Sequence, residues 1–124
     1  MLTLYGGQRT RASLPRWYME EKKISYNLIE LNREKGENLQ AEFLAINPFG
    51  KLPALIDSSI LMPNGEPLKL FESGAILLHL AERYSDDIKT IEDKALTSQW
   101  LQFATQPYQF PSWSPAIERR SFRV

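Results

Sequence analysis

The stretch Asn47-Pro48-Phe49-Gly50-Lys51-Leu52-Pro53-Ala54-Leu55 decides the fold prediction, because it delivers an X-Pro bond from a turn to the start of a strand. The residue before a proline disfavours the α region, so Asn47 ends the helix that precedes the turn. A second stretch, Phe71-Glu72-Ser73-Gly74-Ala75-Ile76, brings an acidic side chain and a hydroxyl to a helix N-terminus. Together the two stretches supply backbone groups, a cation and an anion, which is what a short zwitterionic peptide needs from its receptor.

Outward from these stretches, the hydrophobic periodicity predicts strands and helices in the order β-α-β-α-β-β-α. Met62-Pro63-Asn64-Gly65 predicts a hairpin-type turn between the last two strands. This is the order of the thioredoxin fold, so we predict a fold of the α/β class. The predicted strands are Leu2–Tyr5, Ile24–Leu31, Pro53–Asp57 and Leu68–Phe71, and the predicted helices are Ala12–Lys23, Leu39–Ile46 and Ser73–Tyr84.

Each predicted helix has an apolar side, which we expect to be buried. Ser73 is the predicted N-cap of the third helix. The charged segment Asn32–Asn38 contains a glycine and is predicted to be an exposed loop. The expected apolar positions are Leu14, Trp17, Tyr18 and Met19 in the first helix, Phe43, Leu44 and Ile46 in the second, and Ile76, Leu77, Leu80 and Ala81 in the third.

Beyond residue 84 the sequence predicts the start of an all-α domain. The apolar periodicity of Ile88–Ala104 is typical of a helix, and no periodicity continues after Pro107. We therefore predict a thioredoxin-like domain over residues 1–84, a linker over 85–88, and a truncated or atypical start of a helical domain over 89–124. A lone helix would expose Leu96, Trp100 and Phe103, which favours aggregation, a partner or a dimer.

The composition excludes several classes of function. The 15 basic residues balance the 15 acidic residues, so neither nucleic acid nor an anionic membrane is an expected partner. The chain has no long apolar run and no signal-peptide pattern, so we expect a soluble, cytoplasmic protein. It has no cysteine, which excludes disulfides, thiolate zinc sites and Cys-x-x-Cys redox chemistry. Any sulfur chemistry must therefore use a sulfur that arrives with a ligand.

The two opening stretches, at this spacing and in this β-α order, resemble the glutathione site of the glutathione transferase family. The resemblance covers residues 1 to about 105 and is specific in Asn47–Leu55 and Glu72–Tyr84. It implies that a thioredoxin-like N-terminal domain binds glutathione and that a mostly helical second domain completes the pocket for an electrophile. A homodimer and a role in detoxification are further expectations from this resemblance; no metal is expected, because the chain has no cysteine and a single histidine.

The resemblance also implies a role for each residue of the binding motif. Pro53 is expected to follow a cis peptide bond, which exposes the backbone N–H and C=O of Leu52 to the cysteinyl part of glutathione. Lys51 is expected to meet the glycyl carboxylate. Glu72 is expected to take the γ-glutamyl ammonium, while the hydroxyl of Ser73 and the helix N-terminus take the α-carboxylate.

The group that activates the thiol is less clearly indicated, and the candidates in order are Arg11, Thr10, Tyr5 and Ser13. Arg11 resembles the arginine of the Ser-Arg-Ala-Ser segment in bacterial members, and a solvated side chain is the alternative. Thr10 stands near the serine of some classes, and an N-cap is its alternative; threonine here departs from the family. Tyr5 occupies the tyrosine position of other classes, and a core aromatic residue is its alternative. Ser13 lies deeper in the helix.

Two functions remain open at this stage. One is an enzyme in which the glutathione thiolate attacks a small electrophile. The other is a glutathione-binding or protein-interaction domain without activity, because the helical domain is incomplete. A thioredoxin-like oxidoreductase fails as a third interpretation, because the chain has no thiol. The single histidine, His79, is expected to be structural rather than a metal ligand.

Overall fold

The computed structural model describes residues 1–105. The chain divides into two compact units, Met1–Leu77 and Leu78–Val124, which are described separately. The predicted order of strands and helices is confirmed, with one added 3-10 helix. The elements are β1 (Leu2–Gly6), α1 (Ser13–Glu21), β2 (Asn27–Glu30), η1 (Glu37–Leu39), α2 (Ala41–Leu44), β3 (Ala54–Leu61), β4 (Pro67–Phe71), α3 (Ser73–Tyr84) and α4 (Ile91–Ala104).

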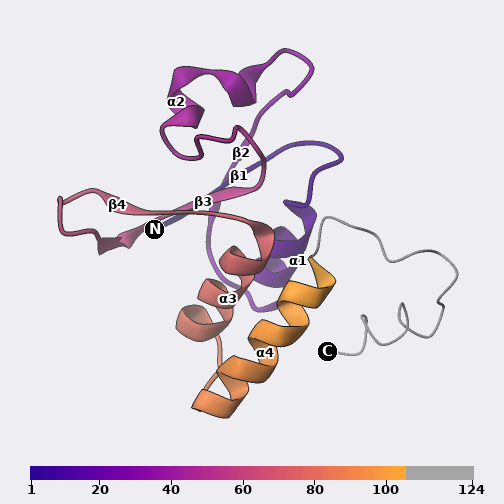
Figure 1. Ribbon diagram of the computed structural model, residues 1–124, viewed down its shortest axis with the longest axis vertical. Helices are drawn as coiled ribbons and strands as arrows, with labels where there is room; N and C mark the ends of the chain where they lie inside the picture. Colours follow the sequence, from indigo (N-terminus) through magenta and orange to yellow (C-terminus); the bar gives the residue numbers. More distant parts are fainter. Residues whose placement is uncertain (106–124) are drawn as a thin grey trace, which may run out of the picture. The chain divides into compact units, whose positions relative to one another are not determined.

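The four strands of the first unit form one mixed sheet in the order β2-β1-β3-β4. β1 pairs with β2 in parallel and with β3 antiparallel, and β4 completes a hairpin with β3. Helix α1 lies on one side of this sheet and α2 on the other (Figure 1). This is the thioredoxin-like arrangement that the sequence predicted, and a parallel βαβ unit followed by a hairpin accounts for it.

The register of the sheet brings three chain segments to one end. Ala54 pairs with Tyr5 of β1 and with Phe71 of β4. The end of β1, the start of β3 and the end of β4 therefore lie next to one another. Since α3 begins at Ser73, immediately after β4, its N-terminus lies at the same end of the sheet.

The core of the first unit follows the alternation of β1 and the buried stripe of α1. Leu2 and Leu4 are buried, whereas Tyr5 is half-buried on the opposite side of the strand. Pro15 and Met19 are the buried residues of α1. They are four positions apart and so share one side of the helix.

This stripe corrects the prediction for the first helix. Trp17 is 63% exposed and Leu14 is also exposed, so of the expected apolar positions only Met19 is fully buried. Trp17 follows Pro15 by two positions, and two residues of an α-helix turn it by about half a revolution. The side chain of Trp17 therefore points away from the buried stripe.

Several boundaries also differ from those predicted. β2 is shorter than Ile24–Leu31, β3 extends past Asp57, and the expected helix over Leu39–Ile46 is divided between η1 and α2. Of that helix, Phe43 is buried while Leu44 and Ile46 are half-buried. The expected exposed loop Asn32–Asn38 already contains the start of η1. Short elements tighten into 3-10 turns easily, which apolar periodicity does not detect.

Ser73 is the first residue of α3 rather than its N-cap. The Glu72 carbonyl accepts a hydrogen bond from the Ile76 N–H at 3.0 Å, which is the position of an N-cap carbonyl. Glu72 has a φ of 75°, so it stands outside the helix. The predicted buried positions of this helix are confirmed, because Ile76, Leu77, Leu80 and Ala81 are all buried.

The second unit contains α4, which starts three residues later than predicted. Thr90 caps it through a capping box, in which Thr90 Oγ1 accepts from the Asp93 N–H at 3.0 Å. Leu96 is exposed as expected, and Trp100 and Phe103 are half-buried with ring centroids 6.0 Å apart. None of the helices within residues 1–105 has the length and apolar character that crossing a bilayer requires. The prediction for residues from Pro107 onward lies outside the described residues.

Candidate functional site

The first part of the site is the turn that leads into β3. The Leu52–Pro53 peptide bond is cis, as the family resemblance implied. Pro53 is buried, Leu52 is half-buried and Lys51 is exposed. Because Ala54 pairs with Phe71, the Leu52–Pro53 pair lies beside Glu72 and Ser73 at the end of the sheet.

A buried amide side chain holds this turn, and the sequence analysis missed its role. Asn47 is 1% exposed; its Oδ1 accepts from the Phe49 N–H at 3.0 Å and its Nδ2 donates to the Lys51 carbonyl at 2.9 Å. Its own carbonyl accepts from the Gly50 N–H at 3.0 Å. The signal was available, because an asparagine that starts a turn commonly bonds the backbone two residues further on.

An aromatic pair connects the turn with the end of β4. The ring centroids of Phe49 and Phe71 are 5.8 Å apart in an edge-to-face arrangement. Such pairs stabilise a fold by roughly 0.5–1.5 kcal/mol in addition to the free energy gained from burying their surface. The contact keeps the segment before Pro53 next to the residues that lead into α3.

Three polar side chains lie at this end of the sheet, those of Lys51, Glu72 and Ser73. Ser73 is 2% exposed, whereas Glu72 and Lys51 are exposed. Within residues 1–105, the side chains of these three residues form neither a hydrogen bond nor an ion pair. The start of α3 thus carries an exposed carboxylate and a buried hydroxyl at its positive end, and the exposed ammonium of Lys51 belongs to the neighbouring turn.

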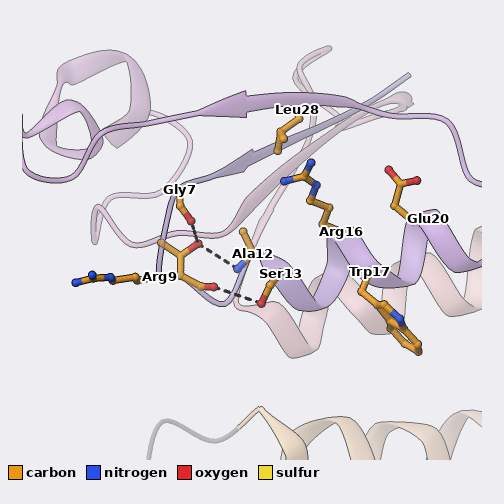
Figure 2. A pocket seen from close by; sticks show the side chains of 9 residues that line it. Gly7, Arg9, Ala12, Ser13, Arg16, Trp17, Glu20 and Leu28 are labelled. Atoms are coloured by element: carbon orange, nitrogen blue, oxygen red, sulfur yellow. Dashed lines mark hydrogen bonds between the residues drawn. The ribbon is translucent and has the colours of Figure 1, made fainter.

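The second part of the site is the loop between β1 and α1, shown in Figure 2. Thr10 Oγ1 donates to the Gly7 carbonyl at 2.7 Å and accepts from the Ala12 N–H at 3.3 Å. Ser13 Oγ donates to the Thr10 carbonyl at 3.5 Å. The N-cap position of α1 is Ala12, which has no side-chain cap. Thr10 is therefore not the helix cap that was its alternative interpretation; its hydroxyl closes the loop instead.

Gly7 is where the loop and the turn meet. A Cβ atom added to Gly7 would lie 2.7 Å from the Leu31 carbonyl oxygen, 3.3 Å from Leu52 Cδ1 and 3.7 Å from Thr10 Cγ2. Only a glycine fits against the Leu31 carbonyl at this distance. The structure thus brings Thr10 and Leu52 to the same glycine.

Tyr5 is not brought together with Thr10. Its ring centroid is 5.7 Å from that of Phe43, and it lines a cavity of about 460 Å³ together with residues of η1, α2 and β2. Thr10 and Ser13 line a different pocket of about 350 Å³ along α1. Arg11 is half-buried in the turn before α1. Among the four candidates for activating a thiol, three lie in or beside one loop and Tyr5 lies elsewhere.

The pocket along α1 also contains charged side chains, and Figure 2 shows Arg16, Trp17 and Glu20 along the helix. The Tyr26 hydroxyl donates to Glu20 Oε1 at 2.6 Å. Burial, and secondly the carboxylate of Glu20, raise the pKa of the Tyr26 hydroxyl. Tyr26 therefore stays protonated at neutral pH. No group of three or more His, Cys, Asp or Glu side chains within residues 1–105 is arranged to hold a metal ion.

The four-stranded mixed sheet, in the order β2-β1-β3-β4 with helices α1 and α2 beside it, defines a thioredoxin-like domain. Residues 1–82 match the family model described as glutathione S-transferase, N-terminal domain. The chain belongs to this family.

Relatives and solved structures agree with this assignment. The chain is 40% identical over 102 residues to the disulfide-bond oxidoreductase YfcG of Escherichia coli, covering 82% of this chain and 47% of that protein. It therefore spans about half the length of this curated relative.

Two bacterial crystal structures are also similar. A glutathione transferase from Burkholderia graminis with two glutathione molecules per subunit matches with a TM-score of 0.71 and 33% identity, over 83% of this chain and 42% of that one. A glutathione transferase from Pseudomonas putida with one glutathione disulfide per subunit matches with a TM-score of 0.69 and 32% identity, over 83% and 44%.

Proposed function

We propose that this chain binds glutathione at the end of the sheet and that the bound thiolate attacks a small electrophile. The observation that carries the proposal is the buried Ser73 beside the exposed Glu72, next to the Leu52–Pro53 pair; the side chains of both form no hydrogen bond or ion pair within residues 1–105. Glutathione-bound structures of similar chains support the choice of ligand.

The proposed binding mode assigns each end of glutathione to one of these groups. The Glu72 carboxylate takes the γ-glutamyl ammonium, and the Ser73 hydroxyl with the start of α3 takes the α-carboxylate. The Leu52 backbone pairs with the cysteinyl residue, and Lys51 meets the glycyl carboxylate. The charges are complementary, because the ligand has one cation and two anions.

In the proposed reaction, the thiol of glutathione loses its proton to solvent and the thiolate is stabilised near the start of α1. The sulfur then forms a bond to an electrophilic carbon, and the leaving group departs with its bonding pair. Arg11 is the first choice for stabilising the thiolate, because a guanidinium keeps its charge and has several donors, whereas the single hydroxyl proton of Thr10 is donated to the Gly7 carbonyl. Ser13 comes last, and Tyr5 has no part in the proposal because it lies against Phe43.

Binding is tested by retention on immobilised glutathione and elution with free glutathione. Glu72→Ala and Ser73→Ala are each expected to lower the affinity by about tenfold or more, since each removes a partner of a charged group. Glu66→Ala is the control, because Glu66 is an exposed carboxylate that pairs with Lys69 at 3.4 Å in the hairpin. Unchanged retention of both site variants would sink the assignment.

Catalysis is tested by the conjugation of an aryl halide in protein already shown to bind glutathione. We expect a rate above the uncatalysed one, and a fall of about tenfold in Arg11→Ala, as is typical for the loss of a charge-stabilising donor. A rate equal to the uncatalysed one would refute catalysis by this chain. The function would then be the alternative, a glutathione-binding or protein-interaction domain.

A second candidate reaction is the reduction of small disulfides with two glutathione molecules. The similarity to a protein named a disulfide-bond oxidoreductase, and to structures holding two glutathiones or glutathione disulfide, favours it. The lack of cysteine excludes only a thiol of the protein. One glutathione thiolate would attack the substrate disulfide and release a thiol, and a second would attack the mixed disulfide, releasing the other thiol and glutathione disulfide. Glutathione disulfide formed from a dialkyl disulfide faster than without protein would identify this reaction.

The homodimer, the cytoplasmic location and the role in detoxification remain predictions from the family. The division into domains at residues 84 and 88 is likewise a proposal. Sedimentation equilibrium of the purified chain would test the first of these.

A further inference from the structure

Arg33 makes a long-range contact with the loop that precedes α1. Its Nη2 donates to the carbonyls of Gln8 at 3.3 Å and Arg9 at 3.1 Å. The contact spans more than twenty residues of sequence, from the segment after β2 to the segment after β1.

The two carbonyls belong to the most strained part of the loop. Arg9 has a φ of 58°, a left-handed conformation that is unfavourable for a residue other than glycine. Such a conformation persists only where surrounding contacts hold it. Thr10, whose hydroxyl bonds to Gly7, follows Arg9 directly. A change in the Arg9 backbone would therefore redirect both Thr10 and Arg11.

The segment that carries Arg33 is itself closed by hydrogen bonds. Glu37 Oε1 accepts from the Asn32 N–H at 2.6 Å, and Asn32 Oδ1 accepts from the Lys35 N–H at 3.2 Å. The Leu31 N–H donates to the Gly6 carbonyl at 2.7 Å. This bond continues the pairing of β1 with β2 to the points where the loop after β1 and the segment after β2 begin. Arg33 is thus presented to the loop from a turn with little freedom of its own.

We propose that Arg33 is a positioning residue for the thiol-activating loop, and this rests on the proposed function. It acts through the backbone of Gln8 and Arg9, which sets the direction of Thr10 and Arg11. A planar guanidinium with several fixed donors suits two consecutive carbonyls better than an ammonium does. Glutathione binding at Lys51, Glu72 and Ser73 does not depend on this contact.

The test compares Arg33→Met, Arg33→Lys and Lys35→Met in the full chain. Lys35→Met is the matched control, because it removes a positive charge from the same segment without touching the loop. In Arg33→Met we expect kcat to fall about tenfold, KM for glutathione to stay within about twofold, and the pKa of the bound thiol to rise. Arg33→Lys should recover part of this loss, and Lys35→Met should match the parent. An unchanged kcat and thiol pKa in Arg33→Met, or an equal effect in Lys35→Met, would overturn the proposal.

A second measurement separates this proposal from the proposed function. NMR order parameters of Gln8, Arg9 and Thr10, measured without glutathione, should fall from about 0.85 in the parent to below about 0.6 in Arg33→Met and stay high in Lys35→Met. Order parameters in Arg33→Met that stay as high as in the parent would refute the positioning role of Arg33, even if glutathione binds. A parent protein that fails to bind glutathione would sink the proposed function, while the order parameters would still decide whether Arg33 holds the loop.

Discussion

The two parts of the candidate site are built differently. The turn before β3 and the start of α3 are held by the register of the sheet and, in the turn, by the hydrogen bonds of the buried Asn47 side chain. The Gly7–Ser13 loop is held by hydrogen bonds of its own Thr10 hydroxyl and of the exposed Arg33. The first part belongs to the core of the fold, whereas the second depends on a few contacts near the surface.

The difference has a consequence for function. Sheet pairings and buried side chains resist local opening, whereas loops with exposed hydrogen bonds open at lower cost. We therefore expect ligand binding to tolerate changes in the loop, and the activation of the thiol to be sensitive to them. The predictions below test this separation, from the largest expected effect to the smallest.

Gly7→Ala should disturb both the Gly7–Ser13 loop and the turn before β3. The added methyl group would meet the Leu31 carbonyl oxygen at 2.7 Å and Leu52 Cδ1 at 3.3 Å, so the backbone must shift. We expect unfolding free energy to fall by roughly 1–3 kcal/mol in urea denaturation, and glutathione affinity to fall by about tenfold.

Gly65→Ala is the control for this variant. Gly65 has a φ of 85° with no atom within 4 Å of an added Cβ, so its loss of stability comes from the backbone alone. It lies in the hairpin turn between β3 and β4, away from the site. We expect it to bind glutathione as the parent does, and an equal loss of affinity in both variants would contradict a specific role for Gly7.

Thr10→Val should separate the activation of the thiol from the binding of glutathione. The substitution keeps the shape of the side chain and removes its hydrogen bonds to Gly7 and Ala12. We expect a loss of about 1 kcal/mol in stability, a conjugation rate about tenfold lower, and a glutathione affinity within about twofold of the parent. The control is Thr3→Val, in the middle of β1. A loss of affinity as large as the loss of rate would show that binding and activation are not separate.

Tyr5→Phe should have the smallest effect. The Tyr5 ring lies against Phe43 and lines the cavity on the α2 side of the sheet. Removing its hydroxyl should change the conjugation rate by less than about twofold and stability by less than about 0.5 kcal/mol. A rate decrease similar to that of Thr10→Val would place Tyr5 back among the groups that activate the thiol.

Much of the first part of the candidate site, the turn before β3 and the start of α3, was predictable because its sequence patterns involve neighbouring residues. The turn signal at Asn47–Leu55, the acidic residue and hydroxyl before an apolar helix, and the order of elements all follow from neighbouring residues. The cis bond at Pro53 was predicted from the family resemblance and is confirmed. The role of Asn47 was missed and the position of Ser73 was corrected, because hydrophobic periodicity and composition do not specify turn geometry or the exact first residue of a helix.

The loop was harder to predict because its geometry depends on distant contacts. The spacing of apolar residues alone assigned Trp17 to the apolar side of α1, but in the structure Pro15 and Met19 are the buried residues of this helix. Tyr5 and Thr10 were both candidates from their positions along the chain, although they line different cavities. Nothing in the charged segment Asn32–Asn38 indicated that Arg33 reaches the loop.

The sequence by itself determined the order of the elements and the family, and it singled out the residues of the proposed binding motif, because short-range patterns encode turns, caps and helix faces. Only the tertiary structure decided which of these residues meet. The pairing of Ala54 with Tyr5 and Phe71 joins the binding motif, and the Arg33 contact shapes the loop. Both depend on register and long-range hydrogen bonds, which arise from the packing of the whole sheet and have no short-range signature.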